Sequence, residues 1–113
     1  MEASVSVRVE FDAAHQMTSA ETADRVRCVR VHGHRWSATA ESLGREEELE
    51  AHLSALVSEW RDALVNEMLP GVDPSPENLA RVIMERLLLR HPRLVLVSVS
   101  DGTLTGIVRN TPR

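Results

Sequence analysis

The chain has 113 residues, which is enough for one domain with a hydrophobic core and too few for two. Its net charge of −4 and its small aromatic content, two Trp, one Phe and no Tyr, exclude the cationic or stacking surfaces that nucleic-acid binding needs. One Cys cannot form an intrachain disulfide, no apolar run approaches the roughly 18 residues of a membrane span, and no signal sequence is recognisable. We therefore expect a single cytoplasmic domain, residues 1–113, with no membrane or nucleic-acid partner.

The first half of the chain contains two segments in which apolar residues alternate with polar ones, residues 4–11 and 32–40. Alternation of this kind predicts strands with one buried side. On the first segment the buried parity continues to His15, and on the second it includes His34. The intervening segment, Gln16 to Val26, is polar and acidic and is typical of a loop.

From about Arg45 the apolar spacing becomes helical, and we predict a helix that continues to Pro70-Gly71. Its buried stripe is expected to comprise Leu49, Leu53, Leu56, Val57, Trp60, Leu64 and Met68. A second helix is predicted to begin with Ser75 as N-cap and Pro76 at the first helical position, and to end at His91-Pro92. Its buried stripe is expected to comprise Leu79, Val82, Ile83 and Leu87.

Two further strands are predicted at the C-terminal end, over residues 93–101 and 104–109, with a turn at Asp101-Gly102. Val95, Val97, Val99 and Asp101 are expected to share one face of the first of them. The order is then β-β-α-α-β-β. We predict an α+β fold in which a four-stranded antiparallel sheet is covered on one face by two helices.

The stretch Cys28-Val-Arg-Val-His32-Gly-His34 combines residue types that bind metals. Histidines two residues apart on a strand share one side, and His15 closes the first predicted strand on its buried side. Three neutral imidazoles with a fourth position open are typical of a catalytic zinc site, whereas a lone buried His is usually a hydrogen-bonded core residue. Taken together, the three histidines favour a shared Zn²⁺.

Three segments together resemble the 6-pyruvoyl tetrahydropterin synthase and 6-carboxytetrahydropterin synthase family. These segments are Phe11-Asp-Ala-Ala-His15, Cys28 to His34, and Pro74-Ser-Pro-Glu77-Asn78-Leu-Ala80, in the family's order. The resemblance covers nearly the whole chain. It implies the tunnelling fold, a zinc ion on His15, His32 and His34, and active sites between the subunits of a homo-oligomer, by resemblance a hexamer.

The resemblance also implies roles for the residues around the metal. Cys28 would be the catalytic base or nucleophile, although the residue type equally fits a fourth zinc ligand or an inert buried thiol. Asp101 falls where the family has a Glu that anchors the pterin ring by paired hydrogen bonds, and Glu77 is a substrate-site candidate. Without the resemblance, Asp101 reads as a turn residue and Glu77 as a first-turn residue that complements the helix dipole.

One departure from the family concerns its proton relay. Family members carry an Asp-His pair that works with the Cys, and here the aligned residues are Arg61-Asp62 or, with a shift of one residue, Asp62-Ala63. The histidine is missing, so Asp62 is the remaining catalytic candidate beside Cys28.

The function implied is that of a zinc-dependent lyase acting on dihydroneopterin triphosphate or a related pterin. Because the relay is altered, two alternatives stay open. One is the same zinc scaffold serving a different small, oxygen-rich substrate, by aldol-type cleavage, dehydration or cyclisation, and the other is a catalytically inactive ligand-binding protein.

Overall fold

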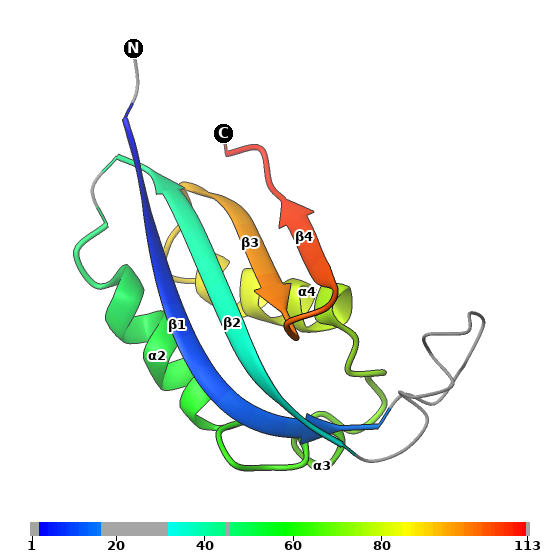
Figure 1. Ribbon diagram of the computed structural model, residues 1–113. Helices are drawn as coiled ribbons and strands as arrows, with labels where there is room; N and C mark the ends of the chain where they lie inside the picture. Colours follow the sequence, from blue (N-terminus) through cyan, green and yellow to red (C-terminus); the bar gives the residue numbers. More distant parts are fainter. Residues whose placement is uncertain (1–2, 17–31, 45, 113) are drawn as a thin grey trace.

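The computed structural model describes residues 3–16, 32–44 and 46–112 (Figure 1). Four strands form one antiparallel sheet in the order β1-β2-β3-β4. The strands are β1 (Ser4–His15), β2 (His32–Leu43), β3 (Leu94–Ser100) and β4 (Thr105–Arg109). Neighbours in the sheet are therefore neighbours in chain order, and the helices that the structure describes are inserted between β2 and β3.

The described helices lie on one face of this sheet (Figure 1). They are α2 (Leu49–Ser58), α3 (Val65–Met68) and α4 (Pro76–Leu88). The first contacts β1 and β2, the last contacts β3 and β4, and the short α3 contacts β1. The predicted α+β arrangement is confirmed. None of these described helices has the length and apolarity to span a bilayer.

The core lies between the sheet and the helices. Phe11, Trp36, Ala38, Val97 and Val99 point into it from the strands, as the alternation predicts. On strand β3 one expected core position differs: Val95 is only partly buried, while Leu94 is fully buried. The cause is an irregularity between Glu41 and Ser42 in the β2–β3 pairing, which shifts the side-chain alternation by one residue.

The prediction of one continuous helix as far as Pro70 was wrong. The helix α2 ends at Ser58, and Asp62 adopts a left-handed backbone conformation with φ of +57°. The chain then runs beside β1, where the Asp62 amide donates to Asp12 O (2.7 Å) and the Ala14 amide donates to Ala63 O (2.9 Å). These bonds pair a backbone carbonyl and a backbone amide at the outer edge of β1, which would stay unpaired if the helix continued. As a result Met68, expected in the core, is 45% exposed and Val65 is buried instead.

The beginning of α4 follows the prediction. Ser75 is the N-cap, its hydroxyl accepts from the Asn78 amide (3.2 Å), and Pro76 occupies the first helical position. This end of α4 lies directly against β4 at Gly106. A Cβ on Gly106 would lie 2.2 Å from the Glu77 backbone nitrogen, so glycine is needed for this approach.

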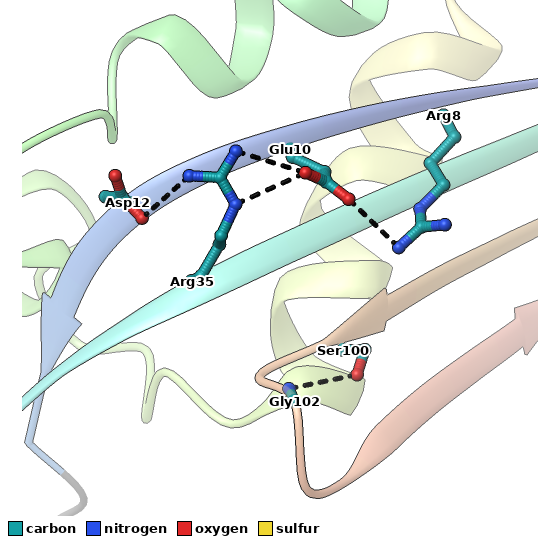
Figure 2. Close-up of polar contacts among 6 residues, drawn as sticks. All are labelled: Arg8, Glu10, Asp12, Arg35, Ser100 and Gly102. Carbon is teal, nitrogen blue, oxygen red and sulfur yellow. Dashed lines mark hydrogen bonds and ion pairs between the residues drawn. The ribbon is translucent and has the colours of Figure 1, made fainter.

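The opposite face of the sheet is polar. Arg35 on β2 reaches across to Glu10 (3.1 Å) and Asp12 (3.5 Å) on β1, and Arg8 contacts Glu10 (3.2 Å) (Figure 2). All four side chains are largely exposed, so each pair contributes little to stability. Arg35 therefore lies on the face of the sheet away from His34.

A chain of hydrogen bonds ties the start of α2 to the end of α4. Arg90 Nη1 lies 3.1 Å from His52 Nε2, His52 Nδ1 lies 2.7 Å from His91 Nε2, and His91 Nδ1 lies 3.1 Å from Glu46 Oε2. Because a guanidinium only donates and a carboxylate only accepts, both imidazoles donate through Nδ1 and accept at Nε2. The two histidines thus have a structural role.

Candidate metal centre

His15 and His34 meet on the buried side of the sheet, at the end of β1 and the start of β2. The register places Ala13 opposite His34 and His15 opposite His32, so the two described imidazoles come from adjacent strands. Their ring centroids are 5.0 Å apart and the rings are nearly perpendicular, at 75°. The prediction that His15 lies on the buried face is confirmed, since it is 1% exposed.

The His15 imidazole is oriented by a backbone group. Its Nδ1 lies 2.8 Å from the carbonyl oxygen of Pro74, which precedes the N-cap of α4. A carbonyl only accepts, so the proton is on Nδ1 and the lone pair is on Nε2. Metal-binding histidines commonly donate their other ring nitrogen to a carbonyl or carboxylate in this way.

A third potential ligand is Asp101, which directly follows the last residue of β3. The ligand atoms of His15, His34 and Asp101 all lie within 4.8 Å of one another. Asp101 is only 6% exposed, and its Oδ1 accepts from the amides of Thr103 and Leu104, both at 2.8 Å. Two imidazoles and a carboxylate form a donor set that suits Zn²⁺, so these residues fit the metal that the sequence predicts.

Aromatic packing fixes the walls beside the two imidazoles. The Trp36 ring lies nearly perpendicular to both, with centroids 4.9 Å from His15 and 5.7 Å from His34. Its indole Nε1 donates to Ala13 O (3.1 Å), and its other side packs on Phe11 at 6.2 Å. Trp36 is fully buried, so these contacts hold both imidazoles in a shielded, largely apolar setting.

The end of β1 is held by Asn66 of α3. Its side-chain amide donates to Gln16 O (2.7 Å), and its Oδ1 accepts from the Gln16 amide (2.8 Å). This pair of bonds imitates strand pairing one residue beyond His15. The last residues of β1 are therefore fixed on both sides, by β2 and by the segment that follows α2.

The remaining sequence-predicted residues are placed as follows. Cys28 lies outside the described residues, and so does the side chain of His32, whose backbone belongs to β2. Asp62 and Glu77 are exposed, and neither carboxylate is part of the His15, His34 and Asp101 cluster. Their roles stay predictions.

Sequence reasoning missed the orienting carbonyl of Pro74 and the clamp made by Asn66. The Pro74-Ser-Pro76 stretch marks where α4 begins, and it does not state that the preceding carbonyl meets His15. No comparable signal marks Asn66 in the sequence.

Comparison with known proteins gives a consistent result. The family model described as 6-pyruvoyl tetrahydropterin synthase matches residues 4–109. No curated protein matches the chain. Among solved structures, 6-pyruvoyl tetrahydropterin synthase from Caenorhabditis elegans is similar, with a TM-score of 0.77 at 15% identity over 98% of this chain and 97% of that one.

Two further structures share the fold at the same identity of 15%. One is an uncharacterised protein from Wolinella succinogenes, with a TM-score of 0.73 over 98% of this chain and 99% of that one. The other is 6-pyruvoyl tetrahydropterin synthase from Plasmodium falciparum, with a TM-score of 0.68 over 96% and 98%. At this identity the likeness establishes the fold and leaves the chemistry to the residues of the site.

Proposed function

Because the chain belongs to the 6-pyruvoyl tetrahydropterin synthase family, we propose that it is a zinc-dependent lyase acting on dihydroneopterin triphosphate or a related pterin. The observation that carries the proposal is the oriented pair His15 and His34 beside a buried carboxylate. Membership supports a pterin-related lyase in general terms, and this geometry is our reason for adding zinc.

The proposal gives each residue a specific task. His15, His32 and His34 hold the ion, and the Pro74 carbonyl keeps His15 in the ligating tautomer. Zinc, when bound, would supply Lewis acidity toward substrate oxygens. Cys28 takes the proton from the substrate, and Asp62 serves as the carboxylate partner in place of the missing histidine.

A second candidate is a reaction on a different oxygen-rich small molecule. It is favoured by the missing histidine of the family's Asp-His pair, which aligns with Arg61-Asp62 or Asp62-Ala63. It is also favoured by the engagement of Asp101 Oδ1 within its own turn. In the family, pterin turnover uses both the Asp-His pair and the carboxylate at the position of Asp101. We infer that turnover of dihydroneopterin triphosphate is weak, since loss of a general acid or base typically costs about 10²–10⁴-fold.

Metal analysis and turnover assays test the proposal together. The wild type should carry about one zinc per chain, and His15→Ala and His34→Ala should lose it, while His52→Ala removes an imidazole elsewhere and should retain it. Turnover should disappear in Cys28→Ala and rise in Ala63→His, which restores a histidine beside Asp62.

The outcomes separate the parts of the proposal. Undiminished zinc in both ligand variants would refute the metal assignment. Pterin conversion that is unchanged in Cys28→Ala would refute the assigned base. An enzyme that needs zinc and Cys28 but converts only a non-pterin substrate would establish the second candidate.

A further inference from the structure

We propose that Asp101 is a ligand of the metal ion itself and does not anchor the substrate; this inference rests on the metal site of the proposed function. The resemblance to the family implied a substrate anchor at this position. Three observations in the structure favour the metal instead: distance, the use of the two carboxylate oxygens, and charge.

The distance between the ligand atoms is close to what one ion requires. Zinc binds imidazole nitrogen at about 2.0–2.1 Å and carboxylate oxygen at about 2.0–2.2 Å, so a nitrogen and an oxygen ligand of one ion are at most about 4.3 Å apart. The ligand atoms of His15, His34 and Asp101 lie within 4.8 Å of one another. Small rotations of these side chains bring all three into the range of a common ion.

The two oxygens of Asp101 are not equivalent. Oδ1 accepts from the Thr103 and Leu104 amides, while the Asp101 amide donates to Leu104 O (3.1 Å), so the carboxylate is part of a closed turn. Paired hydrogen bonds to a substrate ring need both carboxylate oxygens, and Oδ1 already accepts from two amides. A metal ion needs only one oxygen, and the turn keeps the carboxylate close to the two imidazoles.

Charge gives the same answer. Burying a carboxylate is costly unless a cation or several hydrogen bonds compensate for the lost water. Asp101 is 6% exposed, and within the described part of the chain no arginine forms an ion pair with it. The two turn amides donate to Oδ1 alone, and a divalent cation held by His15 and His34 would add a positive charge beside the carboxylate.

The inference has a consequence for specificity. An anionic ligand reduces the net charge of a divalent centre from +2 to +1, which strengthens metal binding and weakens the attraction of the centre for an anionic substrate. With His15, His32 and His34, Asp101 would complete four protein ligands, so a substrate oxygen would have to bind as a fifth ligand, and the substrate must be recognised by groups other than Asp101. This would distinguish the chain from relatives that use a carboxylate at this place to read the substrate ring.

The test compares Asp101→Asn with Asp12→Asn. Asparagine keeps an Oδ1 acceptor for the two turn amides and removes the negative charge, while Asp12→Asn removes the same charge from the exposed opposite face of the sheet. Zinc affinity is measured by competition with a chromogenic chelator, and the visible spectrum is recorded after loading with Co²⁺. We expect the zinc Kd to rise at least about tenfold in Asp101→Asn, with an altered Co²⁺ spectrum, and both to be unchanged in Asp12→Asn.

An unchanged Kd in Asp101→Asn would overturn the inference. So would a raised Kd with an unaltered Co²⁺ spectrum, since the carboxylate would then act from outside the coordination shell. A wild type that binds no zinc would also overturn it. If zinc binds and depends on Asp101 but no pterin is converted, the proposed lyase activity fails and this inference stands.

Discussion

The contact between Gly106 and the start of α4 makes the substitution Gly106→Ala a sensitive test of how the site is built. A Cβ at this position lies 2.2 Å from Glu77 N, 2.4 Å from Glu77 Cα and 2.5 Å from Pro76 C. All three atoms are backbone, so no side-chain rotation relieves the overlap. The first turn of α4 and strand β4 must move apart.

The structure sets the size of that movement. Ordinary contact begins at 3.4 Å, so the separation has to grow by about 1.2 Å from 2.2 Å. The Pro74 carbonyl precedes this turn by two residues and lies 2.8 Å from His15 Nδ1. A hydrogen bond is lost by about 3.5 Å, so a shift of this size is enough to break it. We expect a loss of about 2 kcal/mol in the free energy of unfolding, which lowers the melting temperature by roughly 8 °C.

The assay is thermal and urea unfolding of Gly106→Ala beside Gly33→Ala. The control also places alanine at a strand glycine, but a Cβ on Gly33 meets no atom within 4 Å. Gly33→Ala should unfold like the wild type. In Gly106→Ala we also expect weaker zinc binding, because His15 loses the acceptor that orients it. Equal stability of the two variants would refute the reasoning, since it would mean that α4 is not pressed against β4.

Two other predictions concern stability and assembly. His91→Ala should lower the free energy of unfolding by about 2–4 kcal/mol, because it creates a cavity and leaves Glu46 and His52 without their shared partner. Arg90→Ala, at the exposed end of the same series of hydrogen bonds, should lower it by under about 1 kcal/mol. Chemical denaturation measures both variants, and equal losses would contradict the assignment of His91 as the buried link. The protein should sediment as a homo-oligomer, because the small sheet has strand edges that pairing between copies covers; a 12.6 kDa species at micromolar concentration would be evidence against this.

The parts of the fold that could be predicted are those where one local rule decides. Alternation located β1 and β2, and the pattern of Ser75 followed by Pro76 located the start of α4 to the residue. The end of α2 was not predictable in this way. The spacing from Trp60 to Leu64 and Met68 continues the helical period, and the bonds that end the helix involve β1, more than 40 residues earlier in the chain.

The same distinction applies to the candidate site. The histidines could be identified because their residue type and strand parity are local properties. The position of Asp101 beside His15 and His34 depends on three strands meeting at one end of the sheet, which no local pattern states. Leu94 is buried in place of Val95 for a similar reason, because the irregularity that shifts the alternation lies in the pairing of β3 with β2.

The bonds that the loop after α2 makes to β1 limit how two copies of the chain can pair through their sheets. Asp12 and Ala14 are already engaged on the outer edge of β1, so an incoming strand has the seven residues from Ser4 to Glu10 available. The strand on the other edge of the sheet, β4, has five residues. The five residues of β4 can pair with the seven free residues of β1 in three registers. A shift of one residue between registers turns every side chain of the incoming strand to the opposite face of the sheet. An intermolecular ladder between β1 and β4 that keeps the buried side buried therefore has at most two registers to choose from.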